Sequence, residues 1–328
     1  MNTFGRNFRV SVFGESHGTA VGAVLDGVKA GLPLSVEDFR ADLLRRKSGA
    51  AGTTPRIESD EPEILSGVFE GHTTGAPLTI IFRNENTRSG DYAPLLALPR
   101  PGHADYTARI RWDGFNDPRG GGHFSGRLTL PVVAAGVVAK KMCEYSFATR
   151  LVEVGGFREA PQQEEAVAAA AREGDSLGGV VECRIDGVPA GLGEPFFDSV
   201  ESLLAHAMFA IPGVRGIEFG DGFQAARMKG SEHNDPLRLD DGAVRPAKNG
   251  AGGINGGLTN GGTIRFRVAF KPTSSIAREQ TTLNLSTGLP DTLRIPGRHD
   301  TCFALRTPVI VEALSAIVLT DLRLRFPH

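Results

Sequence analysis

The segment Leu128–Tyr145 reads LTLPVVAAGVVAKKMCEY and is apolar on almost every side of the helix that it predicts. A helix that is apolar all round is typical of the interior of a protein rather than its surface. Pro131 stands near its start, where a helix tolerates proline. We therefore expect this helix to lie in the core, covered by other elements of the chain.

A second segment, Thr263–Phe270, has the alternation of a half-buried β-strand. Apolar side chains occupy every second position from Ile264 onward, while Arg265 and Arg267 fall between them. Successive side chains of a strand point to opposite faces, so one face of this strand is apolar and the other carries two guanidinium groups.

Shorter patterns predict further elements on both sides of these two segments. Helices are expected after a capping box at Ser35–Asp38, at Phe196–Ala210, and from Thr307 to about Leu322. The elements are interspersed without the regular spacing of a doubly wound sheet. We predict a single large α+β domain over residues 1–328, with mainly antiparallel strands. The other predicted strands are Phe8–Phe13, Pro77–Phe82 and Val180–Ile185.

Composition narrows the class of protein. The 328 residues carry a net charge of −2 and no basic stripe of the kind that nucleic-acid binders show, so small anionic molecules are the expected partners. Three widely spaced cysteines fit neither a disulfide framework nor a zinc site, which favours a reducing cytoplasm and no metal. No signal peptide is expected, and the longest apolar run, Leu130–Ala139, is too short to span a bilayer.

The first motif that carries chemistry, Gly14–Gly18, follows a predicted strand and contains Ser16 and His17. Its G-x-S-x-G pattern is formally that of a nucleophile elbow, which would make Ser16 the nucleophile of a serine hydrolase. The segment Thr19–Gly27 does not read as the helix that an elbow requires. The alternatives are a turn that presents both side chains to a ligand and a polar turn without function.

Two further loops contain candidate residues. In Arg100–Asp105, proline and glycine predict a tight turn with His103 at its tip, and imidazole is well suited to exchange protons at neutral pH. In Asp117–Arg127, three consecutive glycines precede the buried helix and permit a phosphate or a planar ring to approach the backbone. Arg119 and Arg127 flank the glycines and add cationic groups. A surface histidine and a plain loop are the simpler explanations.

Two segments in the last third of the chain suit anionic ligands. Lys271–Ser275 places one ammonium and three hydroxyl groups at the end of the alternating strand, a set that suits a phosphate. Nearer the C-terminus, Arg298 is a candidate for binding a carboxylate or phosphate, and Asp300 is a candidate for accepting a proton. A solvated strand end and a surface ion-pair cluster explain the same residues without a ligand. The glycine-rich Asn249–Gly257 has neither dinucleotide-binding nor Walker A spacing.

Taken in chain order, these motifs resemble the chorismate synthase family, and the resemblance covers essentially the whole chain. Nine blocks in one order are far more specific than any single motif. The matching blocks are Phe13–Gly18, Arg100–Thr107, Arg119–Gly122, Gly174–Ser176, Gly187–Glu194, Gly216–Gly220, Ala251–Ile254, Lys271–Ile276 and Gly297–Asp300.

The resemblance implies a β-α-β sandwich, with helices between mainly antiparallel sheets, assembled as a cytoplasmic homotetramer. It implies that 5-enolpyruvylshikimate 3-phosphate is converted into chorismate and phosphate, the last common step of aromatic amino-acid biosynthesis. The reaction is an anti-1,4-elimination without net redox change. It nevertheless requires reduced FMN, with either NADPH or a separate reductase as the source of electrons.

The resemblance also assigns roles to residues. His17 would protonate the departing phosphate, and His103 would protonate the reduced flavin near N1. Asp300, helped by Ser16 and Ser125, would relay the proton from flavin N5. The substrate's anionic groups would be bound by Arg46 and Arg127. Flavin contacts are implied for Ser125, Gly256, Lys271, Pro272, Thr273, Ser274, Ser275 and Arg298, and for the neighbouring pair His123 and Phe124.

The chain departs from the family pattern in two places. His123 and Phe124 stand where the family commonly has arginine and serine, and Ala50–Gly52 where a second arginine is usual. These changes leave open the hypothesis that the protein is a degenerate paralogue, which binds flavin without turnover. The alternative of a serine hydrolase that uses Ser16 or Ser176 also stays open. Because both motif histidines and the C-terminal aspartate are present, we predict an active phosphate lyase.

Overall fold

Two antiparallel sheets form the outer layers of the molecule, which a computed structural model describes at residues 1–55, 58–85, 97–240, 242–295 and 299–326. No helix within these ranges is long and apolar enough to cross a membrane. In strand order, the first sheet contains β1 (Thr3–Phe4), β2 (Arg9–Gly14), β3 (Ala20–Asp26), β7 (Leu78–Arg83) and β4 (Glu63–Ser66). The second contains β10 (Val214–Phe219), β15 (Ile264–Phe270), β9 (Gly179–Asp186) and β8 (Ser146–Val154).

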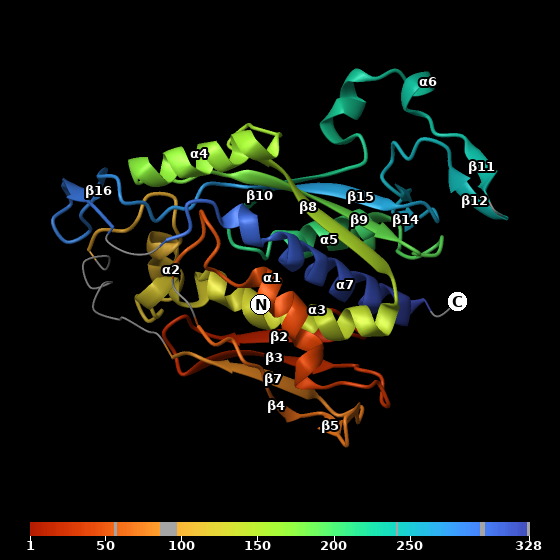
Figure 1. The fold of residues 1–328 in the computed structure, drawn as a ribbon, viewed down its shortest axis with the longest axis horizontal. Helices are drawn as coiled ribbons and strands as arrows, with labels where there is room; N and C mark the ends of the chain where they lie inside the picture. Colours follow the sequence, from red (N-terminus) through yellow and green to blue (C-terminus); the bar gives the residue numbers. More distant parts are fainter. Residues whose placement is uncertain (56–57, 86–96, 241, 296–298, 327–328) are drawn as a thin grey trace.

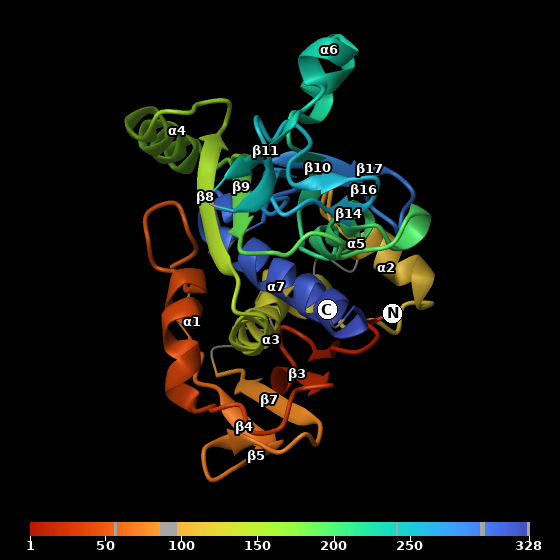
Figure 2. The same cartoon turned by 90° about the vertical axis from the view of Figure 1, so that its right-hand side faces the viewer.

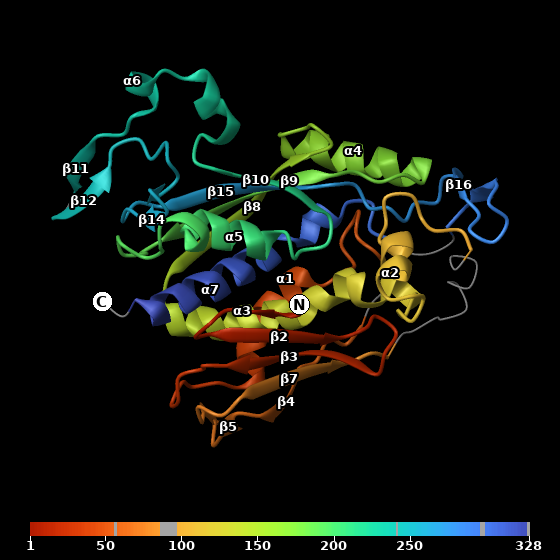
Figure 3. The same ribbon diagram turned by 180° about the vertical axis from the view of Figure 1, so that it is seen from behind.

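Helices fill the space between the two sheets (Figure 1). The helix α3 (Thr129–Cys143) packs against β3 and β7, and α7 (Pro308–Arg325) packs against β8 and β9. The helix α5 (Val200–Met208) contacts α7 and β10, while α1 (Arg40–Arg46) contacts α3 and α7. Figures 2 and 3 show the same order of layers from two other sides. The predicted α+β class, with helices between mainly antiparallel sheets, is therefore confirmed.

The helix predicted from Leu128–Tyr145 is α3, and it lies in the core as expected. Its residues are buried almost throughout, because α7 covers one side and the first sheet covers another. Glu144 adopts a left-handed conformation with φ of 57° and ends the helix. An amphipathic pattern is absent since no face of this helix meets solvent along its length.

The two central helices approach each other most closely at Gly136. A Cβ atom added to Gly136 would lie 2.3 Å from the Ala313 Cβ and 2.5 Å from its Cα, which is far inside van der Waals contact. The backbone of Gly136 is helical, a conformation that any residue can adopt. Glycine is therefore required here by the close packing of the two helices and not by its backbone conformation. The small pair lets the α3 and α7 backbones nearly touch, and this sets the thickness of the helical layer.

We expect Gly136→Ala to destabilise the protein by about 1–3 kcal/mol, because overpacking of a core costs more than the gain in helix propensity returns. The free energy of unfolding in urea measures the effect. Adding Ala313→Gly removes the nearest contacting atom and should recover part of the loss. An unchanged free energy of unfolding in Gly136→Ala would contradict the close approach of the two helices.

A buried carboxylate on α7 fixes the position of α1. Glu312 accepts hydrogen bonds from Lys140 Nζ at 2.6 Å, Arg45 Nη2 at 2.8 Å and the Thr149 hydroxyl at 3.0 Å. Burial alone would raise the pKa of Glu312, but the hydrogen bonds from Arg45 and Lys140 outweigh burial and lower it. The end of α1 is thereby tied to α3, α7 and β8.

The helix predicted over Phe196–Ala210 is wrong as a single element. A short 3₁₀ turn covers Phe196–Asp198, and α5 then runs over Val200–Met208. Between them Ser199 is extended, and its Oγ accepts a hydrogen bond from the backbone N–H of Ser202. Such a serine cap starts a new helix rather than continuing the old one. The four predicted strands are confirmed as β2, β7, β9 and β15, and the last predicted helix as α7.

Smaller elements decorate the sandwich. The helix α4 (Ala160–Glu173) covers the outer face of β8, and α2 (Asp105–Arg111) lies at one end of the molecule (Figure 1). At the other end, α6 (Gly230–His233) and a hairpin project from the body (Figure 2). The four two-stranded pairs are β5 (Val68–Phe69) with β6 (His72–Thr73), β11 (Leu237–Asp240) with β12 (Ala243–Pro246), β13 (Ile254–Asn255) with β14 (Leu258–Thr259), and β16 (Gln280–Leu283) with β17 (Pro290–Leu293).

Candidate active site

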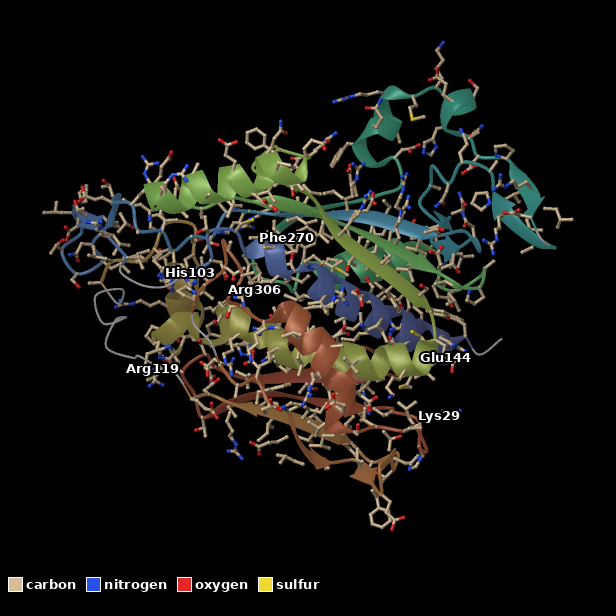
Figure 4. The ribbon with its side chains drawn as sticks, in the orientation of Figure 1. Lys29, His103, Arg119, Glu144, Phe270 and Arg306 are labelled. Carbon is tan, nitrogen blue, oxygen red and sulfur yellow. The ribbon has the colours of Figure 1, made fainter. Side chains whose placement is uncertain are left out.

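A cavity of about 1070 Å³ opens where loops from both sheets meet the ends of α1, α3 and α7. Figure 4 shows His103 and Arg306, which both line it, at the end of the helical layer away from Glu144. The structure brings together at this cavity almost all the residues predicted from sequence. They are Ser16, His17, Arg46, His103, His123, Phe124, Ser125, Arg127, Lys271, Pro272, Thr273, Ser274, Ser275 and Asp300.

The other three predicted positions are Gly256, Arg298 and Arg119. Gly256 lies in the turn between β13 and β14, at the end of the molecule opposite α2 (Figures 1 and 3), and does not line the cavity. Arg298 lies outside the described residues. Arg119 pairs with Asp117 at 2.8 Å on the surface and is not part of the cavity wall.

The Gly14–Gly18 motif forms the connection between β2 and β3. Because a strand follows it rather than a helix, the nucleophile-elbow interpretation of Ser16 is wrong. Ser16 and His17 are instead buried against the cavity, at 1% and 8% exposure. The N–H of Ser16 donates to the carbonyl of Gly122 at 3.1 Å, so the motif is held directly against the triple-glycine loop.

All three consecutive glycines adopt positive φ, at 61°, 82° and 54°. A Cβ atom on Gly120 would lie 2.6 Å from His17 Cδ2 and 2.7 Å from Ser16 Oγ, and one on Gly121 would lie 3.5 Å from His103 Nε2. The loop therefore comes close to both predicted catalytic imidazoles. Glycine is needed here for the backbone conformation and for the close approach.

His103 is held by a buried ion pair. Its Nδ1 lies 2.6 Å from Asp105 Oδ1, and Arg100 binds the same carboxylate with Nε and Nη2, each at 2.7 Å. We assign the Nδ1 proton to the bond with Asp105, which leaves Nε2 facing the cavity. Burial lowers the pKa of His103, and Arg100 and Lys271 add to this effect, while Asp105 opposes it. The imidazole is thus neutral at pH 7 without a ligand.

The two arginines predicted to bind substrate lie side by side. Arg46 ends α1 and Arg127 precedes α3, and both contact the carboxylate of Asp60. Burial lowers the pKa of Arg46 to about 9, and the nearby Arg306 and Arg127 contribute to the shift while Asp60 opposes it. With this pKa the guanidinium of Arg46 remains charged at neutral pH.

The segment after β15 forms another wall. Lys271 Nζ donates to Ser274 Oγ at 2.5 Å, and Ser275 Oγ accepts from Arg100 Nη1 at 2.9 Å. Burial lowers the pKa of Lys271, and the proximity of Arg215 lowers it further. Thr273 Oγ1 is buried and has no hydrogen-bond partner among the described residues. The segment thus combines a cation with a hydroxyl that a ligand can engage.

Asp300 faces the same cavity from the loop before α7. Its Oδ1 accepts from the N–H of Thr54 and its Oδ2 from Arg306 Nη2, each at 2.9 Å. The guanidinium of Arg306 also lies 5.3 Å from the centroid of the Phe303 ring, while its Nε is buried without a partner among the described residues. Beside them, burial lowers the pKa of His299.

The pair that departs from the family pattern is well ordered. His123 Nδ1 lies 2.8 Å from the carbonyl of Gly14, and its Nε2 lies 3.2 Å from Asn2 Oδ1. Phe124 packs against Trp112 with 5.7 Å between ring centroids. His123 therefore ties the triple-glycine loop to the first sheet, whereas an arginine there would project a charge.

Sequence reasoning missed the residues that hold the predicted ones in place. Asp60 and His299 were not singled out, and Arg100 and Asp105 were quoted only as parts of a motif. These residues contact their partners in the folded protein, although the partners can be distant in the chain. The partners of Asp60 are Arg46 and Arg127, which lie 14 and 67 positions away. The clearest available signal was the Arg100–Asp105 block, in which opposite charges flank His103.

Positive charge predominates in the cavity. Six cationic side chains line it against three carboxylates, those of Glu58, Asp60 and Asp300. Five histidines of the described residues also line the cavity, among them His17 and His103, and groups that can exchange protons beside bound anions are a feature of catalytic sites. The fold and the site therefore define an enzyme that acts on small anionic molecules.

Comparison with known proteins identifies the family. The family model described as chorismate synthase matches residues 8–324. A chorismate synthase from Chitinophaga pinensis is 58% identical over 326 residues, covering 99% of this chain and 97% of the relative. One from Korarchaeum cryptofilum is 48% identical, covering 97% and 96%. A chorismate synthase crystal structure superposes with a TM-score of 0.74 at 28% identity, covering 98% and 93%. The chain belongs to the chorismate synthase family.

The chain's membership of this family of carbon–oxygen lyases bears on the alternatives left open by the sequence. Neither a serine hydrolase nor a degenerate flavin-binding paralogue has support from the comparisons. The hydroxyl of Ser176, the second hydrolase candidate, donates to the carbonyl of Thr273 at 2.7 Å and has a structural role.

Proposed function

We propose that this chain converts 5-enolpyruvylshikimate 3-phosphate into chorismate and inorganic phosphate, with reduced FMN as cofactor and with catalysis by His17, His103 and Asp300. The observation that carries the proposal is that these three residues, from distant segments, line one cationic cavity. Its volume of about 1070 Å³ reaches the upper end of the roughly 300–1,000 Å³ typical of ligand sites. The cavity therefore has room for two small ligands.

The cavity wall fits a flavin mononucleotide. Thr273 Oγ1, His299 Nε2 and Arg306 Nε are buried polar atoms without partners among the described residues, and a ligand rich in donors and acceptors would satisfy them. Apolar side chains such as Ile211 and Phe303 supply contact for a planar ring. We assign the cofactor contacts to Ser125, His123, Phe124 and the segment from Lys271 to Ser275. Gly256 and Arg298 stay predictions from sequence.

Each residue has a distinct task in this proposal. Bound reduced FMN would supply electron density transiently and a place for the departing proton. Arg46 and Arg127 bind the substrate's anionic groups. His17, which lies close to the backbone of Gly120, gives a proton to the phosphate as its C–O bond breaks and the electron pair leaves with it.

Two further residues handle protons at the cofactor. Once its imidazole is protonated, His103 would donate from Nε2 toward the N1 edge of the reduced flavin, because Asp105 occupies its Nδ1. Asp300 would relay the proton that the flavin has received from the substrate, helped by the hydroxyls of Ser16 and Ser125, which line the same cavity. A histidine placed as a general acid typically contributes about 10²–10⁴-fold to rate.

The assembly and the reductant belong to the proposal as well. We infer a cytoplasmic homotetramer of single-domain chains, each spanning residues 1–328. The exposed apolar side chains of Leu237, Leu239 and Val244 on the projecting β11–β12 hairpin support subunit contacts. Light scattering measures the mass directly. The electrons for FMN come either from NADPH bound by this protein or from a separate reductase.

An anaerobic phosphate-release assay tests the function. Protein with dithionite-reduced FMN is expected to release one phosphate for each ester consumed, while oxidised FMN alone supports none. A parallel arm with NADPH and oxidised FMN decides whether the protein reduces its own flavin. Absence of phosphate release with reduced FMN would overturn the proposal.

A further inference from the structure

Asp60 is a buried carboxylate that lies between the two arginines assigned to the substrate. Its Oδ1 accepts a hydrogen bond from Arg127 Nη1 at 2.7 Å, and its Oδ2 accepts from Arg46 Nη1 at 3.4 Å. All three side chains are less than a tenth exposed. One carboxylate therefore joins a guanidinium at the end of α1 to a guanidinium just before α3.

Both guanidinium groups are held on a second side. Arg127 Nε donates to Asn84 Oδ1 at 2.6 Å, and its Nη2 donates to the carbonyl of Arg83 at 3.1 Å. Arg46 donates through Nε to Thr129 Oγ1 at 3.0 Å. These neighbours hold each guanidinium in its plane, and among the described residues only Asp60 accepts hydrogen bonds from both guanidinium groups and so sets the position of one relative to the other.

The contacts leave each arginine able to bind a ligand. A guanidinium has five N–H donors, and Arg127 uses three of its nitrogens toward Asp60, Asn84 and Arg83. Two donors remain outside this set, as a bidentate contact with a carboxylate or phosphate requires. Holding the guanidinium in place before the ligand binds lowers the entropy cost of that contact.

The backbone at Asp60 is itself unusual. Its φ is 55°, in the left-handed region that side chains other than glycine, asparagine and aspartate rarely adopt. Positions of this kind persist where the surroundings determine them and are concentrated at functional sites. The loop before β4 thus takes a less favourable conformation and places the carboxylate between the two arginines.

We propose that Asp60 is a positioning residue, which holds Arg46 and Arg127 in the relative arrangement that binds the substrate's anionic groups. The inference rests on the proposed function, because it takes the enolpyruvylshikimate phosphate as the ligand. Asp60 touches neither reacting atom in this scheme and acts only through the two arginines.

Charge alone predicts the opposite of this proposal. A carboxylate in an anion-binding cavity repels the ligand, so its neutralisation should strengthen binding. If Asp60 instead orients the arginines, its neutralisation should weaken binding although the cavity becomes more positive. The sign of the change in affinity therefore distinguishes positioning from simple electrostatics.

Asp60→Asn is the matched variant, because asparagine has the same shape and also tolerates positive φ. Calorimetry measures the affinity for 5-enolpyruvylshikimate 3-phosphate in the presence of oxidised FMN, where no turnover occurs. We expect the dissociation constant to rise roughly 10- to 100-fold, as loss of charge-assisted hydrogen bonds implies. The affinity for oxidised FMN itself should stay within about twofold, because the proposed flavin contacts lie elsewhere.

Two controls isolate the effect. Asp26→Asn removes a surface carboxylate that pairs with Arg9, so it makes the same change in net charge and should leave both affinities unchanged. In an Arg127→Ala background, Asp60→Asn should weaken ester binding by a smaller factor than in the wild type, because one of its two partners is already absent. If Asp60→Asn does not fold, Asp60→Glu replaces it, since the extra methylene displaces the carboxylate and keeps its charge.

Each outcome decides the matter. Weaker ester binding with FMN affinity intact supports the role of Asp60. The role of Asp60 would be overturned by equal or tighter ester binding in Asp60→Asn, or by wild-type affinity in Asp60→Glu where that variant is used. It would also be overturned if Asp60→Asn weakened ester binding by the same factor in the wild type and in the Arg127→Ala background. Each of these results would leave the proposed function in place. Failure of the wild-type protein to bind the ester would overturn the proposed function and this inference together.

Discussion

Alanine at His17 or at His103 is expected to slow anaerobic phosphate release by about 10²–10⁴-fold, because each imidazole acts as a positioned proton donor. Both side chains line the cavity, and each lies close to a glycine of the triple-glycine loop. Single-turnover phosphate release with pre-reduced FMN measures the step without interference from flavin reduction. His72→Ala is the matched control, because this exposed histidine lies on β6 outside the cavity.

The dependence on pH sharpens the test for His103. Burial lowers the pKa of His103 below its usual value, so its protonated fraction falls as pH rises through the mildly acidic range and is already small at pH 7. If proton donation by this residue limits the rate, phosphate release should slow as pH increases. His103→Ala should lose that part of the profile. Wild-type turnover and an unchanged profile in the variant would remove the role assigned to it.

Gly120→Ala is expected to reduce activity by about 10²-fold or more, since displacing catalytic groups by about 1 Å is enough for a loss of this size. The added Cβ would lie 2.6 Å from His17 Cδ2 and 2.7 Å from Ser16 Oγ. Gly120 also has φ of 61°, where an L-residue is strained. Steady-state phosphate release measures the loss of activity, and circular dichroism checks that the fold is retained.

Gly114→Ala separates strain from contact. Gly114 has φ of 81°, and a Cβ atom there would have no neighbour within 4 Å. This control carries a similar backbone penalty without touching either histidine, so its activity should stay close to that of the wild type. Equal losses in the two variants would show that backbone strain alone, and not the contact with His17, explains the effect.

The elements with a clear pattern could be predicted from sequence. The helix α3 and the strand β15 each have one environment along their length, so apolarity or alternation reports it directly. The break at Ser199 was missed because it depends on one capping hydrogen bond. Periodicity averages over several residues and does not register a single cap.

The candidate site likewise contains residues that could be predicted from sequence and residues that could not. Residues that carry chemistry stand in glycine-containing motifs and were found, and the cavity unites His17, His103 and Asp300 although each comes from a separate segment. Asp60, which pairs with both arginines, was not found, because its partners lie close to it only in the folded chain and leave no local signature in the sequence.

The central claim is that one cavity holds the flavin and the phosphate ester in contact. A visible-absorption titration tests it directly: the ester is added to the protein with bound oxidised FMN while calorimetry follows binding. The account predicts a change in the flavin spectrum that saturates at one ester per chain. Ester binding by calorimetry with an unchanged flavin spectrum would contradict it.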